Sequence, residues 1–107
     1  TGIAEIAMAS DLGALIYENN VKLLPEPAKL SEIFNLNPYG TISSGSLLIS
    51  INEEDSQKLI EVLRKNDIYS QIIGKLVSKK EGLKIVTKNN RTETLQFSEI
   101  DEILKIF

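Results

Sequence analysis

The stretch 37–51 constrains the fold of this chain more than any other. Its first half carries turn-forming residues. Pro38 fixes its own φ and biases Asn37 towards extended backbone, while Gly45 permits conformations that other residues avoid. Its second half, 46–51, is a short apolar-rich run with two isoleucines, which is long enough for one buried strand. The stretch therefore predicts a tight loop that leads into a strand at the centre of a sheet.

The loop half of that stretch is also the main candidate binding site. Consecutive backbone N–H groups can surround an anion, and small side chains let a ligand approach the backbone closely. The candidate ligand-binding or phosphate-binding residues are Asn37, Ser43, Ser44, Gly45 and Ser46. Because the loop contains no lysine or arginine, a loop that only turns the chain into a core strand is the competing interpretation.

The length of 107 residues suits one domain, and the contents of 42% hydrophobic and 25% charged residues are those of a globular protein. The net charge of −3 and the lack of a basic stripe argue against a nucleic-acid partner. The absence of cysteine and histidine excludes thiolate and imidazole chemistry, including their metal sites. No apolar run reaches the roughly 20 residues that span a bilayer, and no signal peptide opens the chain, so we expect a cytoplasmic location without a membrane partner.

Periodicity predicts helices up to about residue 10, over 28–35, over 53–65 and after Ser98. It predicts strands over 14–17, 46–51, 72–77, 83–87 and 92–97, with turns at 79–82 and 88–91 that would join the last three strands into a meander. This order fits an α+β fold, a layered sandwich of helices on a mixed sheet. The strand 46–51 and the helix after it resemble one half of a ferredoxin-like unit.

Three packing expectations follow from these elements. The helix 28–35 is expected to bury the face that carries Leu30, Ile33 and Phe34. Leu48 is expected to be buried in a central strand. Gly74, inside a strand, is expected to mark a bulge or a close approach of two backbones.

Four other groups of residues have a structural interpretation beside a functional one. The acidic residues 53–55 could bind a metal, but charges in a first helical turn explain them better. Lysines 79–80 could attract phosphate, although an exposed turn is the simpler interpretation, and residues 17–18 could reach a ligand or only end a strand. Tyr39 could stack on a base or anchor the loop to the core. No catalytic residues are predicted, because no nucleophile, base and orienting group come together.

Three segments together resemble the C-terminal domain of AIR synthase-related proteins. Residues 5–13 are similar to the family's EIAxASxxG corner, residues 36–48 to its GLDPL…EGxLL loop and strand, and residues 73–86 to its IGxV…GVxxV meander. This superfamily includes aminoimidazole ribonucleotide synthetase, the hydrogenase maturation factor HypE and selenophosphate synthetase. Within it, the chain is most similar to HypE-like archaeal members.

The resemblance implies a two-domain, homodimeric enzyme that uses ATP and Mg²⁺ to activate an oxygen of its substrate by phosphoryl transfer. Residues 1–107, which begin without an initiator methionine, would be a fragment that lacks the N-terminal, ATP-binding barrel domain. This domain would close its Gly/Ser loop over the nucleotide or substrate phosphate, and it would not be catalytic alone. Its partners would be that N-terminal domain and a second subunit. The alternative is a non-catalytic interaction or scaffold module that keeps the fold.

Overall fold

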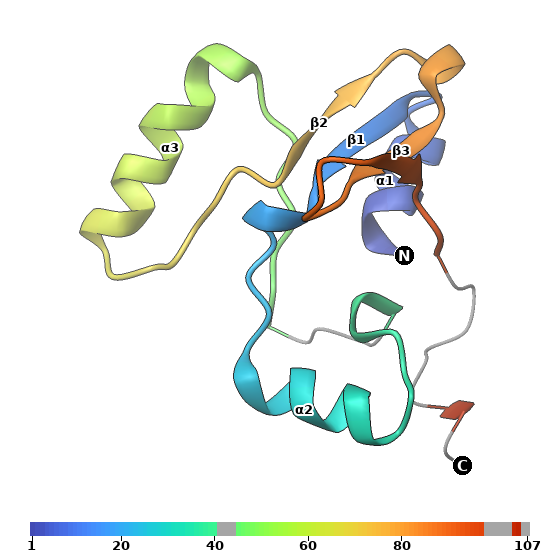
Figure 1. Ribbon diagram of the computed structural model, residues 1–107. Helices are drawn as coiled ribbons and strands as arrows, with labels where there is room; N and C mark the ends of the chain where they lie inside the picture. Colours follow the sequence, from blue (N-terminus) through green and yellow to red (C-terminus); the bar gives the residue numbers. More distant parts are fainter. Residues whose placement is uncertain (41–44, 98–103, 106–107) are drawn as a thin grey trace.

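The computed structural model describes residues 1–40, 45–97 and 104–105. Three helices and four strands form its regular structure (Figure 1): α1 Gly2–Ala9, α2 Pro25–Ile33, α3 Glu53–Lys65, β1 Gly13–Tyr17, β2 Gly74–Val77, β3 Leu83–Val86 and β4 Thr92–Thr94. Short 3₁₀ turns are η1 Glu18–Asn20, η2 Pro38–Gly40 and η3 Lys79–Glu81. The α+β class and the mixed sheet are confirmed, whereas the helix predicted after Ser98 falls largely outside the described residues.

Strand β1 lies inside the sheet, whose order is β2-β1-β3-β4. Ala14 of β1 is opposite Leu76 of the antiparallel β2 and opposite Leu83 of the parallel β3, and β4 adds antiparallel to β3. The predicted meander is therefore wrong at its first turn, because β2 and β3 flank β1 instead of pairing with each other. The most apolar strand takes the position where both of its edges are paired, and the turn η3 carries the chain past its end.

Two glycines allow the backbones around β1 to approach closely. A Cβ atom on Gly13 would lie 2.4 Å from the carbonyl oxygen of Gly82, and one on Gly74 would lie 2.3 Å from the carbonyl oxygen of Leu15. Both distances are far below van der Waals contact, so no other residue fits either position without a shift of the backbone. The close approach expected at Gly74 is confirmed.

Helix α1 packs on the sheet through alanines. Ala4 and Ala7, one helical turn apart, have no exposed surface, and Ala7 packs with the buried residues Ala14 and Ile16 of β1. Small side chains let the helix axis lie close to the strands. Half-buried hydrophobic residues surround this centre: Ile3, Val21, Leu76, Leu83, Ile85 and Leu95. The core is consequently small, and it belongs to the sheet and α1.

All three helices end in a Schellman motif without glycine. Asp11, Asn35 and Asp67 have φ values of 55°, 52° and 58°, the left-handed conformation. The following N–H groups, of Leu12, Leu36 and Ile68, bond to carbonyls five residues earlier in the chain at 2.9, 2.8 and 2.9 Å. Short Asp and Asn side chains tolerate this conformation better than other non-glycine residues. The motif explains why each helix stops at a defined residue.

The predicted central strand 46–51 is absent from the sheet. Its backbone has no strand assignment, and the exposed fractions of Leu47, Leu48, Ile49 and Ile51 lie between 41% and 82%. The expectation that Leu48 is buried is therefore wrong, although its Cδ1 lies beside Gly2 at the start of α1. The physical reason is that β2 and β3 already occupy both edges of β1.

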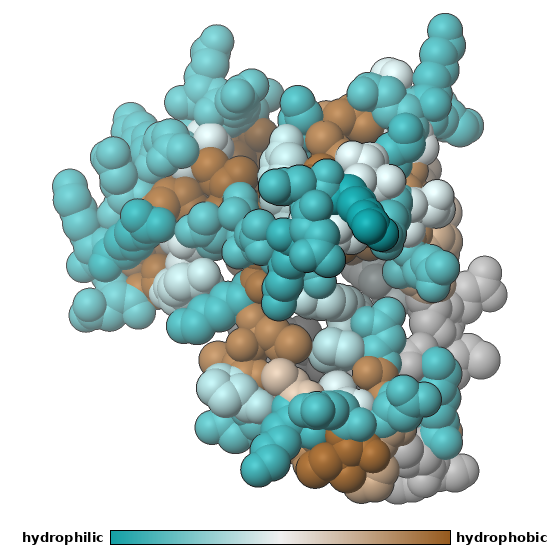
Figure 2. Space-filling model, viewed as in Figure 1, coloured by the Kyte–Doolittle hydropathy of each residue, from teal (hydrophilic) through white to brown (hydrophobic). Residues whose placement is uncertain are grey.

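Helix α2 also departs from expectation. It begins three residues earlier than predicted, at Pro25, because proline is favourable in the first turn of a helix. The supposed buried residues Leu30, Ile33 and Phe34 are about half exposed or more, and Ser31 is buried instead. In Figure 1 both α2 and α3 stand away from the sheet, and Figure 2 shows apolar side chains on the surface over α2. The radius of gyration, 14.7 Å, exceeds the roughly 13 Å of a compact domain of this length.

Candidate functional site

The predicted binding loop begins at the turn η2. The side-chain oxygen of Asn37 accepts the N–H of Tyr39 at 3.1 Å, and its carbonyl accepts the N–H of Gly40 at 3.0 Å. Asn37 is thus held in a local turn that sets the direction of the loop. Ser43 and Ser44 lie outside the described residues.

The other end of the loop is exposed and needs glycine. Gly45 has a φ of 90°, and a Cβ there would meet no atom of the described residues within 4 Å. Ser46 is exposed beside it. The backbone at Gly45 is therefore open to an approaching molecule, and only its conformation requires glycine. The assignment of these five residues to ligand binding stays a prediction.

Tyr39 of the turn η2 experiences the negative charge of Glu18 at the end of β1. Partial burial, and after it the negative charge of Glu18, raise the pKa of the Tyr39 hydroxyl above its usual value. The carboxylate of Glu18 in turn accepts the backbone N–H of Lys88 at 3.0 Å. Glu18 therefore joins η1 to the β3–β4 turn, and its charge acts on Tyr39, which is 39% exposed. Whether Tyr39 stacks on a base or anchors the loop stays a prediction.

The remaining sequence candidates have structural roles. Residues 53–55 are exposed in the first turn of α3, where the helix dipole favours them, and no three acidic residues of the described chain are grouped to hold a metal. The Nζ of Lys79 lies 2.5 Å from Oδ1 of Asp11, an exposed ion pair that joins η3 to the end of α1. Tyr17 donates its backbone N–H to the carbonyl of Ile73 at 2.8 Å.

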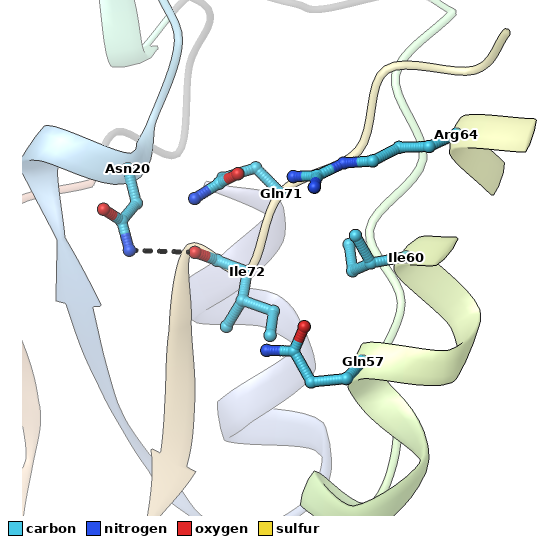
Figure 3. A pocket seen from close by; sticks show the side chains of 6 residues that line it. All are labelled: Asn20, Gln57, Ile60, Arg64, Gln71 and Ile72. Atoms are coloured by element: carbon cyan, nitrogen blue, oxygen red, sulfur yellow. Dashed lines mark hydrogen bonds between the residues drawn. The ribbon is translucent and has the colours of Figure 1, made fainter. Parts of the chain in front are cut away.

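A polar cavity that sequence reasoning missed lies between α3 and the segment that leads into β2 (Figure 3). Its volume is about 300 Å³, and its lining residues are Asn20, Gln57, Ile60, Arg64, Gln71 and Ile72. The spacing of the three α3 residues puts them on one helical face, which is a visible signal. The other wall is formed by Asn20 and by residues 71–72, which are far apart in the chain. No local sequence pattern indicates that these two segments are in contact.

The three helices were compared with the requirements for a membrane-spanning helix. Within the parts of the chain that the structure describes, none of them has the length and apolar character that crossing a bilayer requires.

Comparison with known proteins gives related sequences. Residues 1–86 match the family described as AIR synthase related protein, C-terminal domain. A protein of Methanocaldococcus jannaschii named for hydrogenase expression and formation is 26% identical over 85 residues, and the selenide, water dikinase of the same organism is 34% identical over 85 residues. These alignments cover 78% and 77% of this chain, but 25% and 24% of the two relatives.

The chain thus spans about a quarter of the length of the curated relatives that it matches. The family match, by contrast, extends over most of the chain, from α1 through β3, and it agrees with the α+β architecture. The chain belongs to the family of C-terminal domains of AIR synthase-related proteins.

Proposed function

We propose that this domain is the C-terminal part of a longer ATP-dependent enzyme, in which the loop 37–46 closes over a phosphate group of the nucleotide or substrate. The observation that carries the proposal is the exposed backbone at Gly45, whose φ of 90° and empty surroundings leave room for a ligand. The neighbouring serines would add hydroxyl donors. Membership of a family that uses ATP and Mg²⁺ supports the choice of phosphate.

The loop would position a phosphate, and another part of the enzyme would neutralise its charge. The loop contains no lysine or arginine that could neutralise this charge, and among the described residues no three acidic side chains are grouped. Uncharged donors contribute only about 1 kcal/mol per hydrogen bond, because they exchange water for the ligand. We therefore expect no ATP hydrolysis by residues 1–107 alone.

The proposed partners are the N-terminal domain of the same polypeptide and a second subunit. The exposed apolar residues of 47–51 and of α2 support this proposal, because single-domain proteins rarely leave neighbouring large hydrophobic side chains in water. A stand-alone interaction module would also use such a surface. ATP binding by the full-length protein distinguishes the two functions.

Within the family, we propose a HypE-like role in hydrogenase maturation, and a selenide-dependent dikinase is the second candidate. The 26% identity to the hydrogenase-related protein supports the first, and the 34% identity to the selenide, water dikinase favours the second. The full-length protein should be assayed for ATP consumption with and without selenide. Selenide-dependent consumption would replace the first proposal by the second.

The loop is tested by binding and turnover in the full-length protein. The substitutions Ser44→Ala and Gly45→Ala should each weaken ATP binding or turnover by about three-fold to ten-fold, the effect of one lost hydrogen bond or one displaced backbone. Ser10→Ala, an exposed serine at the end of α1, is the matched control and should change neither. If both loop variants keep the affinity and turnover of the unaltered protein, the loop only turns the chain.

A further inference from the structure

The polar cavity beside α3 carries an inference that is independent of the Gly/Ser loop. We propose that it binds a small phosphate-bearing molecule, with the guanidinium of Arg64 as the principal ligand of the phosphate. The cavity of about 300 Å³ has four polar side chains in its lining, one guanidinium and three primary amides. None of these residues lies in the loop 37–46. The proposal therefore adds a second site to the domain.

One wall of the cavity is a single face of α3. Gln57, Ile60 and Arg64 are spaced three and four residues apart, which places them side by side along the helix. Figure 3 shows the guanidinium of Arg64 directed towards Gln71 across the cavity. Among the described residues, the ion pair within 4 Å is that of Lys79 with Asp11, and no carboxylate pairs with Arg64. Its charge is thus available to an external anion.

The opposite wall is held in place by a hydrogen bond. The side-chain nitrogen of Asn20 donates to the carbonyl of Ile72 at 3.0 Å, in a partly buried contact between residues 52 positions apart. This bond fixes the amide of Asn20 and ties η1 to the segment before β2. Gln71 is adjacent to the acceptor residue. Residues with donor groups on three separate segments therefore line one space before a ligand arrives.

The surroundings of the cavity favour an anion. Lys22 lies with its Nζ 4.6 Å from the centre of the Tyr69 ring, which puts a second cation along the same two segments. Glu18, two residues before Asn20, directs its carboxylate to the N–H of Lys88 in the β3–β4 turn. Two cations, Arg64 and Lys22, thus lie at or beside the cavity, whereas the chain as a whole has a net charge of −3.

The arrangement of donors selects phosphate over carboxylate. The planar guanidinium can satisfy both oxygens of a carboxylate by itself, in a bidentate pair. A tetrahedral phosphate presents further oxygens in other directions, and the amides of Asn20, Gln57 and Gln71 can donate to them. Ile60 and Ile72 offer apolar contact to a small organic part of the ligand.

Inorganic phosphate is the probe that tests this site. Titrated into the ¹⁵N-labelled protein at constant ionic strength, it should shift the amide resonances of Asn20, Arg64, Gln71 and Ile72, with saturation in the millimolar range. Arg64→Gln should weaken the binding at least ten-fold, and Arg64→Lys, which keeps the charge but loses the planar fork, should weaken it by less. An absence of saturable shifts at these residues would overturn the proposal.

Arg91→Gln is the matched control, because it removes the same charge from the exposed β3–β4 turn. It should leave the affinity for phosphate unchanged, and equal weakening by Arg91→Gln and Arg64→Gln would reduce the effect to net charge. Succinate, titrated in parallel, should bind more weakly than phosphate. Equal or tighter binding of succinate would overturn the assignment to a tetrahedral anion.

Discussion

Two regions of the molecule differ in how far they bury their apolar residues. One is the sheet with α1, and the other consists of α2 and residues 45–51. In the first region, three alanines and one isoleucine are buried, although alanine has little apolar surface to bury. In the second, large side chains such as Ile33, Phe34 and Leu47 remain half exposed or more. The difference shows that hydrophobicity alone does not decide burial. Close backbone approach builds the first region, whereas the second presents its apolar groups outward.

This contrast predicts where substitutions destabilise the domain. The largest effect is expected for Gly74→Ala, because its Cβ would overlap the carbonyl of Leu15. We expect the free energy of unfolding to fall by about 3 kcal/mol or more, measured by urea denaturation. Gly82→Ala is the control, since its Cβ would meet no atom and only its backbone conformation, φ 72° and ψ −163°, opposes it, at about 1–3 kcal/mol. Equal losses in the two variants would contradict the close approach.

A comparison of two core-type substitutions tests the contrast directly. Ile16→Ala, at a residue 5% exposed in β1, should lower the free energy of unfolding by about 2–5 kcal/mol. Leu47→Ala, at a residue 82% exposed, should change it by less than about 0.5 kcal/mol. Thermal and urea unfolding of the two variants give both values. A loss at Leu47 as large as that at Ile16 would mean that 46–51 is buried in solution.

A smaller effect is expected at the helix ends. Asp67→Gly should raise the free energy of unfolding by about 0.5–1 kcal/mol, because glycine adopts the left-handed conformation without the steric penalty of a side chain. The change in the urea midpoint measures it. Asp55→Gly, inside α3, should destabilise by a similar amount, and a loss of stability in Asp67→Gly would contradict the observed motif.

The smallest effect concerns pH. The pKa of Tyr39 is raised by burial and by Glu18, so the folded protein holds this proton more tightly than the unfolded chain does. The stabilisation is complete below the ordinary pKa near 10 and is lost as the pH rises through the raised value. Tyr39→Phe should flatten the fall in melting temperature above pH 10. An unchanged slope would show that Tyr39 does not carry this effect.

Sequence reasoning predicted the elements that local patterns define. Helices α1 and α3, strand β1 and the role of Gly74 follow from spacing and residue type within a few positions. The order β2-β1-β3-β4 did not follow, because strand pairing depends on residues far apart in the chain. The run 46–51 was wrongly predicted to be a strand because its apolar composition indicates a preference for burial. Composition does not indicate which other element would cover these residues.

The two candidate sites also differ in how much of each could be predicted from the sequence. The sequence showed that Gly45 permits unusual backbone angles but left open whether its φ is positive, and the structure gives a φ of 90°. The cavity beside α3 could not be predicted, since Asn20 and Ile72 belong to segments that meet only in the folded chain. Arg64 alone reads as one of several cations on an exposed helix. Its significance comes from the opposite wall.

The position of β1 has a consequence for how the domain folds. This strand lies near the start of the chain, yet its partner strands β2 and β3 begin roughly 60 and 70 residues later, so the central pairings close large loops and should form slowly. During synthesis, both edges of β1 keep unpaired backbone N–H and C=O groups until β2 and β3 are made. Such edges can pair with strands of other chains. We therefore expect the tendency to aggregate to fall only after β3 has left the ribosome. The earlier formation of α1 should not be sufficient.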